Sequence, residues 1–243
     1  MRILVISDIH ANYTALETVL QDAGPVDETW CLGDIVGYGP DPNACVEEIR
    51  ERPMLTCLLG NHDVAVLGRM PFESFNGDAR RSLVWHERVL SASNADFLRS
   101  LPENPKVRGD VTLAHGSPRD PVWEYIINTL SARLNFDFFD TNWCFVGHSH
   151  IQCMFQLDEE RDRITLDTPR VGEAIPLTKR AILNPGSVGQ PRDRDPRAAY
   201  AIFDPEAKTW EARRVEYDFV EVQERIRQSK LPEKHALRLA EGW

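Results

Sequence analysis

The sequence has few cysteines and no pair of the CxxC type. It contains five among 243 residues, and three of them (Cys31, Cys57 and Cys144) lie in apolar runs, where a reduced cysteine behaves as a small hydrophobic residue. The odd number and the spacing disfavour a disulfide framework and a cysteine-ligated zinc site.

Long apolar stretches, a secretory leader and an excess of positive charge are also missing. Uncharged apolar runs such as residues 3–6 are far too short to cross a bilayer, and a strand pattern follows Met1-Arg2 directly, without a leader. The formal net charge of −10 disfavours broad nucleic-acid binding, which needs a basic face. We therefore expect a cytoplasmic protein with no membrane contact. A phosphate substrate stays open, because bound divalent cations would reverse the charge locally.

Two common catalytic arrangements are absent as well. There is no phosphate-binding loop of the GxxxxGK[ST] type, which argues against a P-loop nucleotidase. Ser149 and Ser187 have no base placed beside them in sequence, so a covalent seryl mechanism is disfavoured.

The first sixty residues alternate between two patterns. Buried strands are expected at 3–6, 29–32 and 54–59, separated by helices at about 12–24 and 43–52. This alternation predicts parallel strands with crossover helices. In such sheets ligands bind beyond the carboxyl ends of the strands.

The middle of the chain reads as mostly helical from 64 to 109. His86 falls on an apolar stripe there, which predicts a packing residue rather than a ligand. Strands are expected at 111–114 and 143–146, with a helical patch at 130–139 between them.

Short strand-like runs fill residues 151–217 and predict a mostly antiparallel sheet packed against the first. A helix with Phe219 and Val222 on one face follows, and the charged tail to Trp243 is expected to fray or to cover a neighbour. We expect one domain over 1–243, with 218–243 as its C-terminal helix and tail.

Polar side chains with metal-ligand chemistry stand at the ends of five of the predicted strands. Three are oxygen donors and four are imidazoles: Asp8, His10, Asp34, Asn61, His115, His148 and His150. Two pairs, Asp8/His10 and His148/His150, have i,i+2 spacing. In an extended chain this spacing points both side chains of a pair to the same side. Seven donors exceed the need of one tetrahedral zinc and suit two cations sharing a carboxylate, with Mn, Fe, Zn or Co all compatible.

Each of these residues taken alone has a plainer explanation, as a turn, a helix cap or a hydrogen-bonded core histidine. Five of the seven histidines belong to these motifs, counting His62. Their recurrence at five separate strand ends favours a metal site.

These motifs resemble, in order, those of the calcineurin-like metallophosphoesterases, in particular the small bacterial and archaeal branch. The segments that carry the resemblance are Asp8-x-His10, Gly33-Asp34, Gly60-Asn61-His62-Asp63, His115-Gly116, Gly147-His148-Ser149-His150 and the stretch from Asn184 to Asp193. The resemblance implies an α/β fold, a four-layer α/β/β/α sandwich of two facing mixed sheets flanked by helices, with a dinuclear centre at one end.

The resemblance also implies a role for each residue. Asp8, His10 and His150 would hold one divalent ion (Mn, Fe, Zn, Ni or Co), and Asn61, His115 and His148 a second. Asp34 would bridge the two ions. His62 would stand beside them unligated, its ring oriented by Asp63.

Two such cations would lower the pKa of a shared water toward about 7. This water would then attack phosphorus. His62 would protonate the departing oxygen or stabilise charge in the transition state.

Substrate contacts are less clear from the sequence. Arg192 is either a phosphate clamp or part of a solvated charged turn, and Tyr38 either lines the pocket or packs. Asn76 and Arg69 are further candidates, and loops 35–42, 64–80 and 118–130 are expected to form the walls.

Three functions follow from the resemblance. The first is a phosphodiesterase, with phosphomonoesters also possible as substrates. The second is a dinucleoside polyphosphate (nucleotide pyrophosphate) hydrolase, and the third a non-catalytic scaffold, which the intact donor set and His62 disfavour. The expected partner is a small phosphate ester or nucleotide, and the resemblance implies a homodimer.

Overall fold

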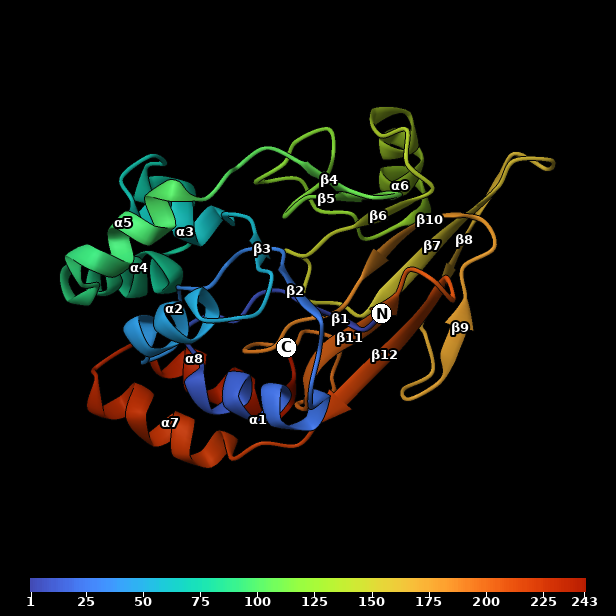
Figure 1. Cartoon of the computed structure of the whole chain (residues 1–243). Helices are drawn as coiled ribbons and strands as arrows, with labels where there is room; N and C mark the ends of the chain where they lie inside the picture. The colour runs from blue at the N-terminus through green and yellow to red at the C-terminus, as the bar shows by residue number, and fades with distance from the viewer.

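The computed structural model describes residues 1–243 and contains two six-stranded mixed sheets that face each other, with helices on their outer faces (Figure 1). The predicted four-layer α/β/β/α sandwich is confirmed. The strand orders are β3-β2-β1-β11-β12-β9 in the first sheet and β4-β5-β6-β10-β7-β8 in the second.

The first sheet is built from both ends of the chain. Its strands are β1 (Ile3–Ile6), β2 (Glu28–Cys31), β3 (Thr56–Cys57), β9 (Ala174–Pro176), β11 (Ala198–Asp204) and β12 (Thr209–Val215). β1, β2 and β3 are parallel, and β11 joins β1 antiparallel. The helices on this side of the molecule are α1 (Tyr13–Ala23), α2 (Pro42–Arg50), α3 (Asn61–Val66), α4 (Gly77–Val89), α5 (Ala92–Ser100), α7 (Phe219–Gln228) and α8 (Glu233–Glu241), with a 3-10 turn at Phe72–Ser74.

The second sheet comes from the middle of the chain. Its strands are β4 (Lys106–Arg108), β5 (Val111–Leu113), β6 (Trp143–Phe145), β7 (Cys153–Asp158), β8 (Arg163–Asp167) and β10 (Arg180–Asn184). α6 (Thr129–Asn135) and a 3-10 turn at Phe136–Phe138 cover its outer face.

Strand β1 explains why four layers form. Ile3 and Val5 point into the core between the sheets, while Leu4 and Ile6 pack under the helices on the outer face. Because successive side chains of a strand point to opposite faces, a strand that is apolar at every position needs cover on both sides.

The strand arrangement differs from what the sequence predicted. The run 151–217 does not make a sheet of its own, because β11 and β12 return to pair with β1 and β10 inserts beside β6. The sequence did not reveal β4 and β9, since both are short edge strands with mostly exposed side chains. Of the two alternatives for the C-terminal tail, the structure shows cover and not fraying: the tail forms α8, whose Ala236 and Leu239 pack on α7.

No helix of the structure combines the length and the apolar character needed to span a membrane.

Substituting Phe145 tests how much the core between the sheets contributes to stability. Its fully buried ring lies 4.7 Å from that of Trp210 and 5.1 Å from that of Phe203, centroid to centroid. Phe145→Ala is expected to lower the free energy of unfolding by about 3–5 kcal/mol, through lost burial and a cavity. Phe138→Ala, at a position with 55% exposure, is the control and should change it by less than about 0.5 kcal/mol. Urea titration measures both, and equal losses would contradict this account of the core.

Candidate metal centre

The seven predicted donors lie together at one end of the two sheets. Each follows the carboxyl end of a strand, and the donors come after β1 (Asp8, His10), β2 (Asp34), β3 (Asn61), β5 (His115) and β6 (His148, His150). All seven are buried. Both sheets therefore contribute to one site.

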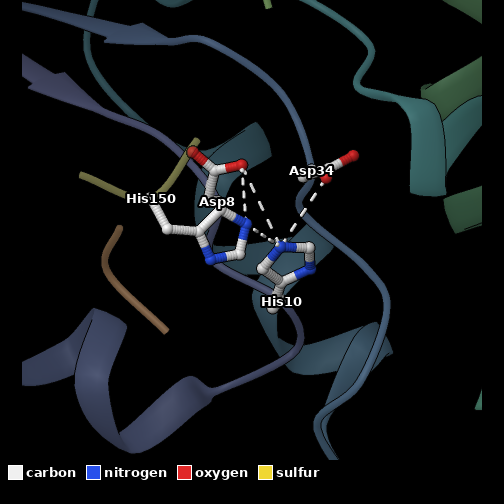
Figure 2. A group of neighbouring side chains, drawn as sticks. All are labelled: Asp8, His10, Asp34 and His150. Atoms are coloured by element: carbon white, nitrogen blue, oxygen red, sulfur yellow. Dashed lines mark hydrogen bonds and ion pairs between the residues drawn. The ribbon is translucent and has the colours of Figure 1, made fainter. Parts of the chain in front are cut away.

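The first cluster contains Asp8, His10, Asp34 and His150 (Figure 2). His10 Nε2 lies 3.0 Å from His150 Nε2 and 3.6 Å from Asp34 Oδ2, and His150 Nε2 lies 3.4 Å from Asp8 Oδ1. One potential ligand atom from each of the four residues lies within 4.8 Å of the corresponding atom of every other.

The second cluster shares Asp34 with the first and adds His115 and His148. His115 Nε2 lies 3.5 Å from Asp34 Oδ2 and 3.1 Å from Asn61 Oδ1. Asp34 is thus the single carboxylate common to both groups.

A backbone carbonyl fixes the tautomer of every imidazole in the two clusters. A carbonyl oxygen only accepts, so the ring nitrogen facing it carries the proton. These contacts are His10 Nδ1 to Val36 O, His115 Nδ1 to Leu32 O, His150 Nδ1 to Gln190 O and His148 Nε2 to Trp123 O. The other nitrogen of each neutral ring therefore presents a lone pair, as in metal-ligating histidines held by a second partner.

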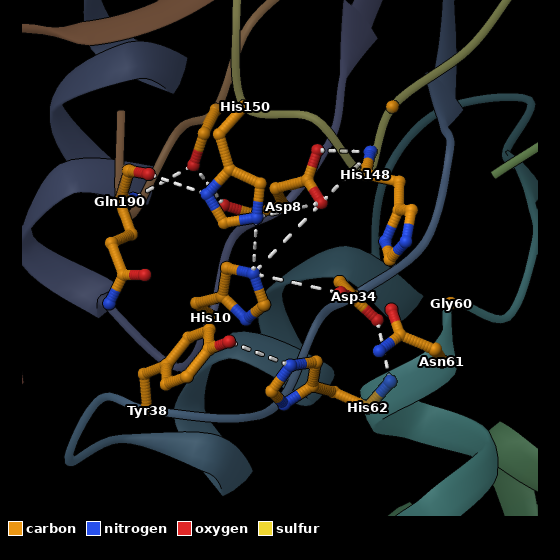
Figure 3. Close-up of polar contacts among 12 residues, drawn as sticks. Asp8, His10, Asp34, Tyr38, Gly60, Asn61, His62, His148, His150 and Gln190 are labelled. Atoms are coloured by element: carbon orange, nitrogen blue, oxygen red, sulfur yellow. Dashed lines mark hydrogen bonds and ion pairs between the residues drawn. The ribbon is translucent and has the colours of Figure 1, made fainter. Parts of the chain in front are cut away.

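The unprotonated nitrogens of His10 and His150 face each other (Figure 3). His10 Nε2 and His150 Nε2 are 3.0 Å apart with no proton left to share, and His115 Nε2 faces the amide oxygen of Asn61 in the same way. Such an arrangement of acceptors is repulsive unless a positive ion lies among them. The donor set fits divalent cations.

The ionisation of the site leads to the same conclusion. Burial lowers the pKa of all four imidazoles, which keeps them neutral and able to ligate. Burial raises the pKa of Asp8 to about 7, and burial together with Asp63 and Asp8 raises that of Asp34 well above its usual range. A bound cation would neutralise the negative charge of the closely spaced Asp8 and Asp34 carboxylates.

Left-handed backbone, and not extended chain, brings the donors together. Positive φ occurs at five of the seven: Asp8 (54°), His10 (50°), Asp34 (54°), His148 (64°) and His150 (60°). The extended geometry predicted for Asp8/His10 and His148/His150 is therefore wrong, because the strands end before the ligands begin. Asp and His tolerate this conformation better than most residues, and such strain concentrates at functional sites.

The stretch after β10 supports the ligands from behind. The Ser187 hydroxyl donates to the Asp8 carbonyl at 2.7 Å, and the Gln190 carbonyl accepts from His150. The Asn184 amide donates to the Gly147 carbonyl at 2.7 Å, just before His148. These bonds hold both ligand loops in register.

His62 is buried beside the clusters and faces Tyr38. Its Nε2 lies 3.1 Å from the Tyr38 hydroxyl, while its Nδ1 has no partner and packs against Gly37. A Cβ at Gly37 would lie 2.4 Å from that nitrogen, so only glycine fits there.

The prediction that Asp63 orients the His62 ring is wrong. The Asp63 carboxylate accepts from the backbone amides of Gly60, Ile35 and Val36 at 3.0–3.3 Å. It closes the turn at the start of α3 and ties this turn to the loop after Asp34. The neighbouring histidine takes its orientation from Tyr38 instead.

A cavity of about 130 Å³ opens over the two clusters. Tyr38, Asn76 and Arg192 line it, so Arg192 is not part of a solvated turn. Arg69 lies elsewhere, paired with Glu103.

Part of the cavity wall is aromatic and was not predicted from the sequence: it consists of Phe75, Trp123 and Tyr125. They come from two of the three loops expected to form it. An aromatic residue in an irregular loop carries no signal that separates a pocket wall from ordinary packing.

His86 packs in the core, and its ring also bonds the Gly37 amide and the Gly39 carbonyl at 2.8 Å. It therefore shapes the loop that carries Tyr38.

A larger groove of about 740 Å³ at the other end of the sheets, near Asp158 and Lys179, offers no comparable chemistry. Lys179 is paired with Asp158, and Arg180 donates to the carbonyls of Phe136 and Phe139.

The motif order and this geometry agree with comparisons to known proteins. A family model described as the calcineurin-like phosphoesterase superfamily domain matches residues 1–208. The chain belongs to this superfamily.

Individual relatives extend over almost the whole chain. A metallophosphoesterase from Sphaerobacter thermophilus, known from its crystal structure, is 49% identical with a TM-score of 0.92, covering 100% of this chain and 99% of its own. An uncharacterized protein of Methanocaldococcus jannaschii is 40% identical over 95% of this chain and 94% of its own length. A hypothetical protein of Pyrococcus horikoshii shares the fold at 21% identity, with a TM-score of 0.78 over 100% of this chain and 98% of its own.

Proposed function

We propose that this member of the superfamily is a metal-dependent phosphodiesterase with two divalent ions in its site. The observation that carries the proposal is the pair of buried donor clusters that share Asp34, in which His10, His115 and His150 turn their unprotonated nitrogens toward the other donors. Asp8, His10 and His150 would hold one ion with Asp34, and Asn61, His115 and His148 the other. When bound, such ions polarise phosphoryl oxygens and lower the pKa of a water that serves as nucleophile.

The protein's own side chains would bind and protonate the substrate. Arg192 is the cationic side chain of the cavity, and its guanidinium is held by Tyr38 and Gln190 at 3.2 and 3.0 Å. It would bind a phosphoryl oxygen. His62 would give a proton from Nε2 to the departing oxygen, with the Tyr38 hydroxyl keeping that nitrogen in the cavity wall.

Charge in the cavity favours a diester over a dinucleoside polyphosphate. A diester carries one negative charge at its phosphate, whereas a polyphosphate chain carries several that require further cationic groups. Arg192 alone of the cavity-lining residues is Lys or Arg. The exposed Trp123 and Tyr125 at the wall provide apolar contact for an ester group.

Metal analysis combined with turnover tests this proposal. Purified protein incubated with Mn²⁺ is expected to bind two ions per chain and to hydrolyse bis-p-nitrophenyl phosphate faster than p-nitrophenyl phosphate and diadenosine tetraphosphate. Faster turnover of diadenosine tetraphosphate would establish the second hypothesis instead. A protein that binds two ions and hydrolyses none of the three would support the scaffold.

A further inference from the structure

The two C-terminal helices, α7 and α8, lie beyond the residues that the family model matches, yet they close the site from behind. A narrow gap of about 10 Å³ is bounded by His10 and Tyr38 on one side and by Val222, Ile226 and Leu239 on the other. The apolar face of this helix pair is therefore the back wall of the first ligand cluster.

His235 of α8 makes the most direct contact with the loop that carries Tyr38. The side chain is 1% exposed, and its Nε2 donates to the Asp78 carbonyl at the start of α4 at 3.1 Å. Thus anchored, the imidazole meets the Tyr38 ring in a T-shaped contact with the centroids 4.8 Å apart. Tyr38 itself has a left-handed backbone, with φ of 59°, a conformation that persists only where the surroundings enforce it.

Tyr38 connects α8 to both groups that would meet the substrate. Its hydroxyl lies 3.1 Å from His62 Nε2 and 3.2 Å from Arg192 Nη2, and its ring lies under the guanidinium at 5.7 Å. A shift of this ring would displace His62 and Arg192 together. The Tyr38 ring also packs on that of His10, with the centroids 4.5 Å apart. The bonds that orient the four imidazole donors go to backbone carbonyls and not to Tyr38, so we expect the metal donors to keep their places.

A second contact joins the end of α8 to the segment of Arg192. The Arg194 amide donates to the Gly242 carbonyl at 2.7 Å. Gly242 has φ of 65°, and a Cβ there would lie 2.7 Å from the backbone nitrogen of Asp195. The helix thus holds the cavity wall at two points, Tyr38 and the residues just after Arg192.

We propose that α8 is a positioning element of the active site, with His235 acting through Tyr38 on Arg192 and His62. The inference rests on the proposed function in so far as the site binds phosphate. It assigns His235 a positioning role, since the side chain does not line the cavity over the two clusters.

The test compares His235→Ala, His235→Phe and Leu237→Ala. Leu237 is 50% exposed on the same helix, so its alanine variant controls for truncating an α8 side chain. His235→Phe keeps a ring against Tyr38 and gives up the bond to Asp78. Each protein is loaded with Mn²⁺. Metal content, the Kd of inorganic phosphate by calorimetry, and kcat and KM for bis-p-nitrophenyl phosphate are measured.

For His235→Ala we expect wild-type metal content, with the phosphate Kd and the KM raised about tenfold, since a buried ring contact that orders the binding arginine is lost. His235→Phe should recover most of this loss, and Leu237→Ala should match the wild type. Gly242→Ala should weaken phosphate binding in the same direction, through the segment of Arg192.

Two results would overturn the inference. One is unchanged phosphate affinity in His235→Ala, and the other is a loss of metal as large as the loss of phosphate affinity. If the wild type binds phosphate but hydrolyses no ester, the proposed function fails while the Kd comparison still decides the role of α8. A metal-loaded wild type that binds no phosphate overturns both.

Discussion

Asp34→Asn is expected to remove most of the bound metal and to lower diesterase turnover by about 10³-fold or more, because the two proposed ions would lose their common ligand. The Oδ1 atom of Asp34 accepts from the His62 amide at 2.8 Å, and asparagine keeps this acceptor. Oδ2 faces both His10 and His115, at 3.6 and 3.5 Å, and becomes an NH₂ group in the variant. The substitution therefore removes the ligand atom and preserves the turn.

The same variant should gain stability when no metal is present. Burial, Asp63 and Asp8 all raise the pKa of Asp34, so its charge opposes folding of the metal-free protein near neutral pH. An NH₂ group can also donate to the imidazole lone pairs. We expect a higher Tm than the wild type after treatment with a chelator, and a lower one in excess Mn²⁺. Asp137→Asn, an exposed charge change, is the control. Wild-type metal content in Asp34→Asn would refute the bridging role.

His62→Ala is expected to keep both metal ions and to lower kcat for bis-p-nitrophenyl phosphate by about 10²-fold, the usual range for loss of a proton donor. The ring touches the clusters only through packing, with its centroid 4.9 Å from that of His10. Metal analysis and steady-state kinetics on the same sample check the two halves of this expectation.

A second substrate separates the two roles open to His62. Diphenyl phosphate releases phenol, which has a pKa near that of tyrosine, about 10, and so needs a proton more than the activated nitrophenol does. A proton donor predicts a larger loss with diphenyl phosphate, whereas charge stabilisation predicts similar losses with both. Unchanged rates with both substrates would remove His62 from the mechanism.

The sequence predicted the layers better than the order of the strands. Ile3 to Ile6 is apolar at every position, which predicts cover on both faces of the first sheet. The resemblance of the motifs to the calcineurin-like family implied the four layers. Nothing local in Ala198–Asp204 indicates that this strand pairs with β1, about two hundred residues earlier. That pairing depends on which partner offers complementary packing, a property of the folded chain. β4 and β9 are edge strands too exposed to show a pattern.

The residues that form the site could be predicted from the sequence for a different reason. Seven donors at strand ends recur in a way that no single turn explains, so their number carried the information. The groups that orient the four imidazoles could not be predicted from the sequence, because they are backbone carbonyls and any residue supplies one. Asp63 illustrates the error that results: adjacency suggested that it orients the His62 ring, while folding directs its carboxylate to backbone amides.

The left-handed residues at the rim limit how such a centre can be transplanted. A designer who grafts two aspartates and three histidines onto the ends of ordinary strands would obtain the correct residue types at diverging angles. The scaffold must supply the unusual main-chain bend at Asp8, His10, Asp34, His148 and His150, and must offer it from two opposed sheets at once. What has to be copied is the shape of the rim, to which the side chains are then added.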